Sequence, residues 1–426
     1  MKKNDRLSGY FDVIKETMSS QEFQLYCDEN VKKIVQHAYQ NAPKFKKRMD
    51  KVGLLPGDIQ NSGDLRKVPV LKKEELMKCQ VEDPPFGGFL AQPVELVKRI
   101  YISPGPIYDP HSESVVRTMT QVFYNCGFRR GDIVLNTWSY HFVPAGCLLD
   151  DAFSSLGAIV IPAGVGQTEL QVINMNKLEV TAFTGTTGFL MAIIKKAEAM
   201  GYDFKRDFFL EVALVGGEMG GGPMRDVFES KYGLITSDAY GTADVGLLAY
   251  ECRERTGMHF VTDAFVEIVD PESGERLGPG DVGEIVATPY NFVYPLIRFG
   301  TGDLASYSEE PCLCGRTTPK IEKIIGRIGE AIRIRGLFLH RNQLDQVFKH
   351  FPEVTKYQVT VDREDHRDKL SVLVEVNKHD LDKSGIGRKL TKRMQEICTM
   401  RPDEIFVVAK GSLSEGYSVL QDLRVY

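Results

Sequence analysis

Residues 180–217 read VTAFTGTTGFLMAIIKKAEAMGYDFKRDFFLEVALVGG, and their pattern decides the class of fold. Two short β-rich runs, 180–184 and 212–217, stand on either side of a helical segment at 187–200. A strand, a helix and a second strand in this order are typical of two parallel strands joined by a crossover helix. The stretch therefore predicts part of an α/β sheet.

The same alternation extends through residues 94–239. Earlier β-rich runs lie at 94–102, 132–138 and 158–164, and the other helical segments lie at 112–126, 145–156, 169–178 and 223–231. Together the runs form five β–α alternations, which predict a parallel sheet with helices on its faces. Ligands of such sheets bind at the carboxyl ends of the strands.

Different patterns precede and follow this β/α core. Residues 1–93 predict a helical lead-in, and residues 240–325 predict a β-rich subdomain because several turn signals break their strands. Residues 327–426 predict a small α+β domain. We therefore expect an N-terminal domain of residues 1–326, joined through Gly329 to this second domain.

Composition excludes several classes of protein. The 426 residues are 42% hydrophobic and 26% charged, and a net charge of −5 provides no general field for nucleic acid or an anionic membrane. No window approaches the ~20 apolar residues of a membrane-spanning helix, and the start MKKNDRLSGYFDV lacks the apolar stretch of a signal peptide. We expect a cytoplasmic protein without nucleic-acid or membrane partners, and a homodimer as the commonest default.

Three of the eight cysteines, together with one histidine, point to a metal site. Cys252, His259, Cys312 and Cys314 make the three-thiol, one-imidazole set that suits four-coordinate structural zinc. Such a set leaves no ligand position for water, so the metal would clamp two loops and contribute folding energy instead of chemistry. The alternative is that the thiols are small buried residues and that His259 is an ordinary histidine.

Five short motifs follow one another in a recognisable order. They are Val165-Gly166-Gln167-Thr168-Glu169, Val215-Gly216-Gly217-Glu218, Asp238-Ala239-Tyr240-Gly241-Thr242-Ala243-Asp244, Leu296-Ile297-Arg298-Phe299-Gly300-Thr301-Gly302-Asp303-Leu304, and Gly326-Arg327 with Ile334-Arg335-Gly336. Over nearly the whole chain they resemble the adenylate-forming superfamily and, within it, the phenylacetate-CoA ligase family. Each motif alone is weak, but five in this order are specific for the fold.

The resemblance implies an α/β fold of two domains. A large N-terminal domain would hold the nucleotide and acid sites, and a mobile C-terminal domain would rotate between two half-reactions. The first half-reaction makes an acyl-adenylate from a carboxylic acid and ATP, and the second passes the acyl group to the thiol of CoA. The resemblance thus implies ATP or AMP, magnesium and CoA as cofactors, and an aromatic or related acid as substrate.

The resemblance also assigns residues to the nucleotide. The implied set is Gly216, Gly217, Glu218, Asp238, Ala239, Tyr240, Gly241, Thr242, Asp303 and Arg327. Glycines let the backbone approach a flat purine, Tyr240 can lie against its face, and Asp238 can accept from its exocyclic amine. Asp303 can accept two ribose hydroxyls, and Arg327 can hold the ribose or a phosphate.

Catalytic roles are implied for Arg327 and for Asp244, which stands where the family usually has a magnesium-binding glutamate. By analogy the acid pocket lies near Tyr140, His141, Ala163, Gly164 and Tyr240. Each residue has a plainer interpretation: Tyr240 as core, Asp303 as a turn residue, and Arg327 as half of a surface ion pair.

The chain departs from the family at its phosphate loop. The family pattern Ser-Ser-Gly-Thr-Thr-Gly-Lys-Pro is replaced by Ser103-Pro104-Gly105-Pro106-Ile107-Tyr108-Asp109-Pro110, so two prolines remove N–H donors and Asp109 replaces the lysine. A unit charge pair at ~4 Å and an effective dielectric of ~20 is worth ~4 kcal/mol, so the exchange predicts repulsion of a triphosphate. Thr184-Gly185-Thr186-Thr187-Gly188 mimics the loop, but it lacks the lysine and comes two β–α units later; it predicts an acid-site or adenine-side loop.

A second departure lies in Ser414-Glu415-Gly416-Tyr417, where the family has a lysine in the position of Tyr417. Three hypotheses follow. The chain is an AMP-forming ligase that joins an aromatic or similar acid to CoA, or an accessory or sensor protein that binds AMP, an acyl-adenylate or an aryl-CoA, or an enzyme that uses acyl-CoA without ATP.

Overall fold

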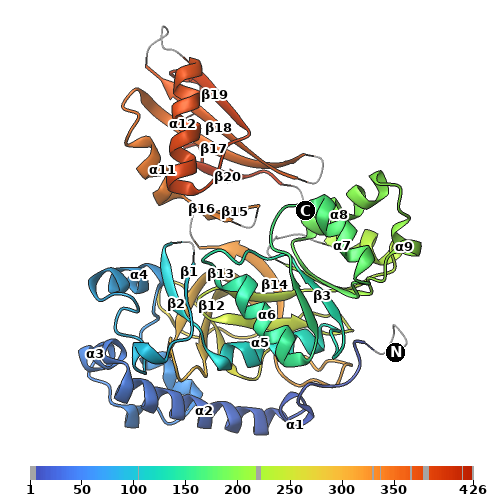
Figure 1. The fold of residues 1–426 in the computed structure, drawn as a ribbon. Helices are drawn as coiled ribbons and strands as arrows, with labels where there is room; N and C mark the ends of the chain where they lie inside the picture. The colour runs from blue at the N-terminus through green and yellow to red at the C-terminus, as the bar shows by residue number, and fades with distance from the viewer. Residues whose placement is uncertain are drawn as a thin grey trace. The chain divides into compact units, whose positions relative to one another are not determined.

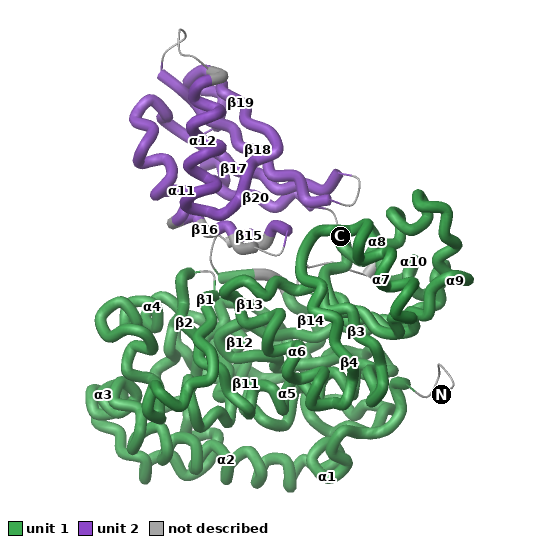
Figure 2. Tube along the Cα trace, in the orientation of Figure 1, with its two compact units in different colours: residues 1–216, 221–328 green, residues 217–220, 329–426 purple. Residues whose placement is uncertain are grey.

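The computed structural model describes residues 6–103, 105–216, 222–328, 331–335, 337–364, 367–377, 383–414 and 416–424. The chain divides into two compact units, the first of which ends at Ile328 (Figure 2). This division falls two residues after the domain boundary predicted between 326 and 327. The expected hinge residue Gly329 and the motif residues Gly217, Glu218 and Gly336 lie outside the described residues.

The first unit begins with helices α1 (Val13–Glu16), α2 (Ser20–Asn41), α3 (Pro43–Lys51) and α4 (Lys73–Glu82) (Figure 1). Helix α2 has a capping box, in which the N–H of Ser19 donates to Glu22 at 2.8 Å. Its apolar face, with Val31 and Ile34 fully buried, packs against residues of α3. The helical lead-in is therefore as the sequence predicts.

The parallel sheet has the strand order β4-β3-β5-β6-β7. Its strands are β3 (Ile133–Asn136), β4 (Ile159–Pro162), β5 (Ala182–Gly185), β6 (Val212–Val215) and β7 (Ile235–Ser237). The associated helices are α5 (Glu113–Asn125), α6 (Pro144–Leu156), α7 (Thr168–Lys177), α8 (Thr187–Ala199), α9 (Phe204–Asp207) and α10 (Gly222–Ser230). Stacked rings of Phe123 and Phe153, with centroids 4.0 Å apart, join α5 to α6 in the core.

One predicted strand of this sheet is wrong. Within the run 94–102, Val94–Leu96 form a short 3₁₀ helix, and only the end of the run enters β1 (Ile100–Ser103). Strand β1 pairs antiparallel with β2 (Ile107–Pro110) in a two-stranded sheet of its own. The short link between them allows only antiparallel pairing, because parallel strands need a long crossover.

The β-rich region forms a seven-stranded sheet of antiparallel neighbours, in the order β11-β12-β13-β14-β10-β9-β8. Its strands are β8 (Ala239–Thr242), β9 (Gly246–Glu251), β10 (Met258–Phe260), β11 (Ala264–Val269), β12 (Gly283–Pro289), β13 (Phe299–Ser308) and β14 (Lys320–Arg327). The turn signals at 270–282 connect β11 to β12 as a hairpin, as the sequence predicts.

The second unit is α+β. It contains β15 (Ala331–Ile334), β16 (Leu337–His340), α11 (Arg341–Phe348), β17 (Val354–Glu364), β18 (Arg367–Val376), α12 (Lys383–Cys398), β19 (Glu404–Ala409) and β20 (Leu420–Asp422). Both helices pack on the sheet β19-β18-β17-β20 around a core of its own. Across the described parts of both units, no helix has the length and apolarity to cross a membrane.

Candidate active site and metal cluster

Four of the five residues predicted for the acid pocket follow the carboxyl ends of β3 and β4, whereas the fifth, Tyr240, lies on β8 of the other sheet. The hydroxyl of Tyr140 donates to Asp150 at 3.0 Å and accepts from Asn136 at 2.8 Å. The N–H of Gly164 donates to the carbonyl of Asn136 at 3.0 Å, and a Cβ at Gly164 would lie 4.0 Å from the Tyr140 ring. Ala163 is half-buried and His141 is exposed.

The loop at 184–188, which mimics a phosphate loop, makes contacts that stabilise the fold. The Thr186 hydroxyl caps α8 by accepting from the N–H of Phe189 at 3.2 Å, and the Thr184 hydroxyl accepts from the Trp138 indole at 3.0 Å. A Cβ at Gly185 would lie 2.0 Å from the Thr137 hydroxyl oxygen. Close packing against the loop after β3 therefore requires this glycine, without any bound phosphate.

Three motifs distant in sequence converge on Asp303. One carboxylate oxygen accepts from the Tyr240 hydroxyl at 2.9 Å, and the other accepts from Nε of Arg327 at 2.8 Å. The Tyr240 hydroxyl also lies 3.1 Å from that of Thr301. Burial, then the Asp303 carboxylate, raises the pKa of Tyr240 well above its ordinary value, so the phenol stays a donor. The ring is 7% exposed and belongs to the core, as in the plainer interpretation of Tyr240.

In the motif around Asp238, the Asp238 carboxylate is a candidate ligand-binding group, whereas Gly241 is required by packing. A carboxylate oxygen of Asp238 accepts from the N–H of Ala239 at 2.8 Å, and burial, then the charge of Glu251, raises the pKa of Asp238 to about 7. A Cβ at Gly241 would lie 2.3 Å from the carbonyl oxygen of Gly246. The β8–β9 hairpin therefore accounts for Gly241 without a ligand.

Sequence reasoning missed Lys73, the first residue of α4. Its ammonium lies 3.1 Å from one oxygen of Asp244, whose side chain is 1% exposed. The other oxygen of Asp244 and the buried Thr242 hydroxyl have no hydrogen-bond partner within the described residues. A free carboxylate oxygen is the type of ligand that magnesium binds, and the adjacent ammonium is a cation at the site. No local signal marks Lys73, because its role depends on a contact between the helical lead-in and β8–β9.

The structure corrects the expected role of Asp109. Its side chain is 4% exposed, and one oxygen accepts from the Ser103 hydroxyl at 2.5 Å across the β1–β2 hairpin. Burial, and next the neighbouring Asp244 carboxylate, raises the pKa of Asp109 well above its ordinary value. A protonated Asp109 carries no charge, so the repulsion predicted from the Lys-to-Asp exchange does not apply to this form.

A cation also lies beside the departure in the second unit. The Lys356 ammonium is 5.5 Å from the centroid of the Tyr417 ring and donates to the carbonyl of Leu413 at 3.3 Å. Lys356 belongs to β17, and a helix and two strands separate it from Tyr417 in the sequence. The contact between Lys356 and Tyr417 therefore could not be predicted from residue spacing.

The four predicted metal ligands meet at one point of the β-rich sheet. Their ligand atoms all lie within 4.8 Å of one another, with 3.6 Å between the Sγ atoms of Cys252 and Cys312 and 3.4 Å between Sγ of Cys314 and Nε2 of His259. A tetrahedral zinc site with Zn–S bonds of about 2.3 Å separates ligand sulfurs by roughly 3.8 Å. The four residues therefore fit a zinc ion.

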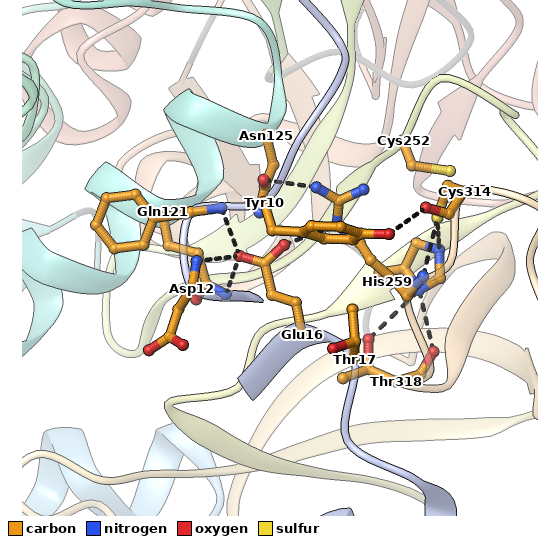
Figure 3. A network of polar contacts seen from close by, with 12 residues as sticks. Tyr10, Asp12, Glu16, Thr17, Gln121, Asn125, Cys252, His259, Cys314 and Thr318 are labelled. Atoms are coloured by element: carbon orange, nitrogen blue, oxygen red, sulfur yellow. Dashed lines mark hydrogen bonds and ion pairs between the residues drawn. The ribbon is translucent and has the colours of Figure 1, made fainter. Parts of the chain in front are cut away.

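Hydrogen bonds around the cluster orient its ligands. The Nδ1 of fully buried His259 lies 3.0 Å from the carbonyl of Thr318, so Nδ1–H donates there and the Nε2 lone pair faces the sulfurs (Figure 3). A hydrogen bond with Cys252 is the main cause that lowers the pKa of the Cys314 thiol, and the N–H of Arg316 donates to this sulfur at 3.4 Å. Thiolates are the form of cysteine that binds metal.

The N-terminal segment packs against this cluster. The Tyr10 hydroxyl donates to the carbonyl of Cys314 at 3.0 Å (Figure 3). Arg316 pairs with Glu16 at 2.9 Å. Arg316 also donates to Asn125 at 2.7 Å. The side chains of Arg316 and Glu16 are 4% and 0% exposed, so this is a buried ion pair between α1 and the metal-ligand loop.

The architecture is that of an adenylate-forming enzyme. A 2-hydroxyisobutyryl-CoA ligase, solved with its acyl-adenylate and CoA, has a TM-score of 0.90 at 22% identity, covering 97% of this chain and 92% of that one. Residues 336–418 match the model of the AMP-binding enzyme C-terminal domain. These likenesses confirm the fold predicted from the motifs.

Curated relatives narrow this class. A phenylacetate-CoA ligase of Aromatoleum evansii is 30% identical over 382 residues, which cover 85% of each chain. One from Thermus thermophilus is 29% identical over 376 residues, covering 85% of this chain and 83% of the relative. The chain belongs to the phenylacetate-CoA ligase family.

Proposed function

We propose that the protein is an AMP-forming ligase that converts an aromatic or related carboxylic acid into its CoA thioester through an acyl-adenylate. The observation that carries the proposal is the convergence of Tyr240 and Arg327 on Asp303, in a chain of this family. A carboxylate held in this way can accept hydroxyls of a ribose, while the arginine remains close to a phosphate.

The other nucleotide contacts follow from the same site. Asp238 would accept from the base, and Asp244 would hold magnesium through its oxygen that lacks a partner. Magnesium, when bound, would neutralise phosphate charge. The acid would lie near Tyr140, His141, Ala163 and Gly164. We propose an aromatic acid as substrate because the curated relatives are named phenylacetate-CoA ligases.

Lys73 supports adenylation despite the altered loop. Its ammonium, 3.1 Å from the proposed magnesium ligand Asp244, would compensate for the lysine replaced by Asp109. Burial raises the pKa of Asp109, and its uncharged form would not repel phosphate. We therefore favour an active ligase over an accessory protein, although the lack of a lysine at Tyr417 favours a slow first half-reaction.

Isotope exchange between pyrophosphate and ATP, measured over a panel of aryl and alkyl acids, tests this function. We expect exchange that depends on an aryl acid and on magnesium. Absence of exchange and of ATP binding, together with measurable AMP or CoA binding, would establish the accessory protein. Acyl-CoA turnover without any nucleotide binding would establish the ATP-independent enzyme.

We also propose that the Cys252–His259–Cys312–Cys314 cluster binds one structural zinc ion and that the protein resides in the cytoplasm. The four ligand atoms support the first proposal. The lack of a disulfide among the eight described cysteines supports a reducing compartment. Metal analysis of the purified protein should give about one equivalent of zinc. Less than half an equivalent under non-chelating conditions would contradict the metal site.

A further inference from the structure

Glu251 lies between the proposed base acceptor and the first metal ligand. It is the last residue of β9, and Cys252 follows directly. The backbone N–H of Glu251 donates to the carbonyl of Asp238 at 3.0 Å, and its side chain accepts from the N–H of Asp238 at 3.1 Å. A single residue therefore holds both backbone groups of Asp238.

Arg225, on α10, fixes the carboxylate that makes this contact. Its two terminal nitrogens donate to the two oxygens of Glu251 at 2.7 and 3.1 Å, and its Nε donates to the Thr236 hydroxyl at 3.2 Å. The Arg225 and Glu251 side chains are only 13% and 16% exposed. A bidentate pair shielded from water is among the strongest and most directional polar contacts.

The chain after Cys252 turns back toward the same helix. The N–H of Arg255 donates to the carbonyl of Cys252 at 3.2 Å, and its backbone has a φ of +54°. Its guanidinium donates to Glu229 of α10 at 2.8 Å and to the carbonyl of Thr236 at 2.9 Å. A left-handed conformation at a residue other than glycine persists only where neighbouring contacts determine it. A metal ion bound to Cys252 would fix the first residue of this turn.

We propose that Glu251 and Arg225 are positioning residues for the nucleotide base, and that metal binding at Cys252 controls their hold on Asp238. This inference rests on the proposed nucleotide site and metal cluster. Without the metal, the turn at 252–255 loosens, and the Asp238 carboxylate is no longer held in the position where it accepts a hydrogen bond from the base. The contacts of Asp303 and Arg327 come from other strands and remain.

Discrimination between AMP and IMP reports on the proposed contact of Asp238, because IMP carries a carbonyl in place of the exocyclic amine from which a carboxylate would accept. Dissociation constants of both nucleotides should be measured by calorimetry on the full chain, before and after a zinc chelator. We expect AMP to bind roughly tenfold more tightly than IMP in the metal-loaded protein. This ratio should fall toward one after chelation and return with added zinc.

Two results are distinguishable. If the metal-loaded protein binds no AMP, the proposed function fails and the inference fails with it. If AMP binds and its preference over IMP is the same with and without metal, with circular dichroism showing a folded chain in both states, only the inference is overturned.

Variants test the positioning pair independently of the metal. Glu251→Gln keeps the side-chain length but loses the charged pair with Arg225, and should lower the AMP-to-IMP preference several-fold at unchanged zinc content. Glu198→Gln is the matched control, because Glu198 pairs with Lys231 at 3.3 Å on the surface of the same unit. An equal loss of AMP and IMP affinity in Glu251→Gln would mean a merely structural role and would overturn the inference. If the variant does not fold, the chelation experiment decides.

Discussion

At the scale of single residues, the altered motifs are accompanied by charges from elsewhere in the chain. Lys73 lies beside Asp244 in the first unit, and Lys356 lies beside Tyr417 in the second. Asp109, which the sequence alone marks as repulsive to phosphate, is buried and bonded to Ser103. The charge of a side chain near a ligand therefore depends on its burial as much as on its type.

Lys73→Ala should slow pyrophosphate exchange by about 10²–10³-fold, because it removes a cation where charge develops on the phosphates. Lys73→Arg should restore part of the rate. Lys72→Ala is the control, since Lys72 is the exposed neighbour at the start of the same helix. Equal effects of the two alanine variants would contradict a specific role for Lys73.

Asp238 should make stability depend on pH. Its pKa of about 7 in the folded state lies above the ordinary value of 3.8, so the folded state binds more protons between pH 4 and 7. The protein therefore loses stability from this group as the pH rises through that range. Asp238→Asn carries no such charge and should become more stable relative to the wild type from pH 5 to pH 8. Thermal unfolding midpoints measured over this range check the trend, and a constant difference would refute it.

At the scale of elements, the four proposed zinc ligands come from two segments of the β-rich region, and the N-terminal segment packs against one of them. Cys252 directly follows β9, His259 lies on β10, and the loop before β14 contributes Cys312 and Cys314. The Arg316–Glu16 pair attaches α1 to that loop. The N-terminal segment is thus attached to the loop that carries Cys312 and Cys314.

Glu16→Gln should destabilise the protein by about 3–5 kcal/mol, because it leaves the buried Arg316 charge without its partner. Glu29→Gln is the control: Glu29 pairs with Lys33 on the exposed face of α2, where such a pair is worth about 0.3–0.5 kcal/mol. Chemical denaturation followed by tryptophan fluorescence and circular dichroism measures both. A small effect of Glu16→Gln would show that the N-terminal segment is not held by this pair.

At the scale of the whole molecule, the chain combines two units that fold around separate cores. The first unit contains Asp238, Tyr240, Asp244, Asp303 and Arg327. The second contains the altered segment 414–417, with Tyr417 in the place of a lysine. Substitutions in the second unit therefore leave the proposed nucleotide-binding residues of the first unit unchanged. Their effect on the rate of adenylation can be measured separately.

Tyr417→Lys should accelerate pyrophosphate exchange by at least roughly tenfold, because it returns a cation to the motif that lacks one. The dissociation constant of AMP should stay unchanged, since the proposed base and ribose contacts belong to the first unit. Tyr417→Gln, which adds no charge, is the control. If Lys356 already supplies the needed charge, Tyr417→Lys will give no gain and Lys356→Ala will lower the rate.

The sequence by itself determined the α/β class and the family resemblance, and it singled out the four residues proposed as zinc ligands. Each of these is carried by local patterns: the period of apolar residues, the order of short motifs, and the residue types that bind zinc. It misassigned the run at 94–102, because a β-rich run does not reveal its partner, whereas the short link after Ser103 does.

Only the tertiary structure decided which charges act at the site. The contact of Lys73 with Asp244, the burial of Asp109 and the hold of Glu251 on Asp238 all join segments far apart in the sequence. The packing reasons for Gly185 and Gly241 likewise appear only when neighbouring strands are in place. Burial and through-space charge set the protonation of a group, and neither is encoded in the spacing of residues along the chain.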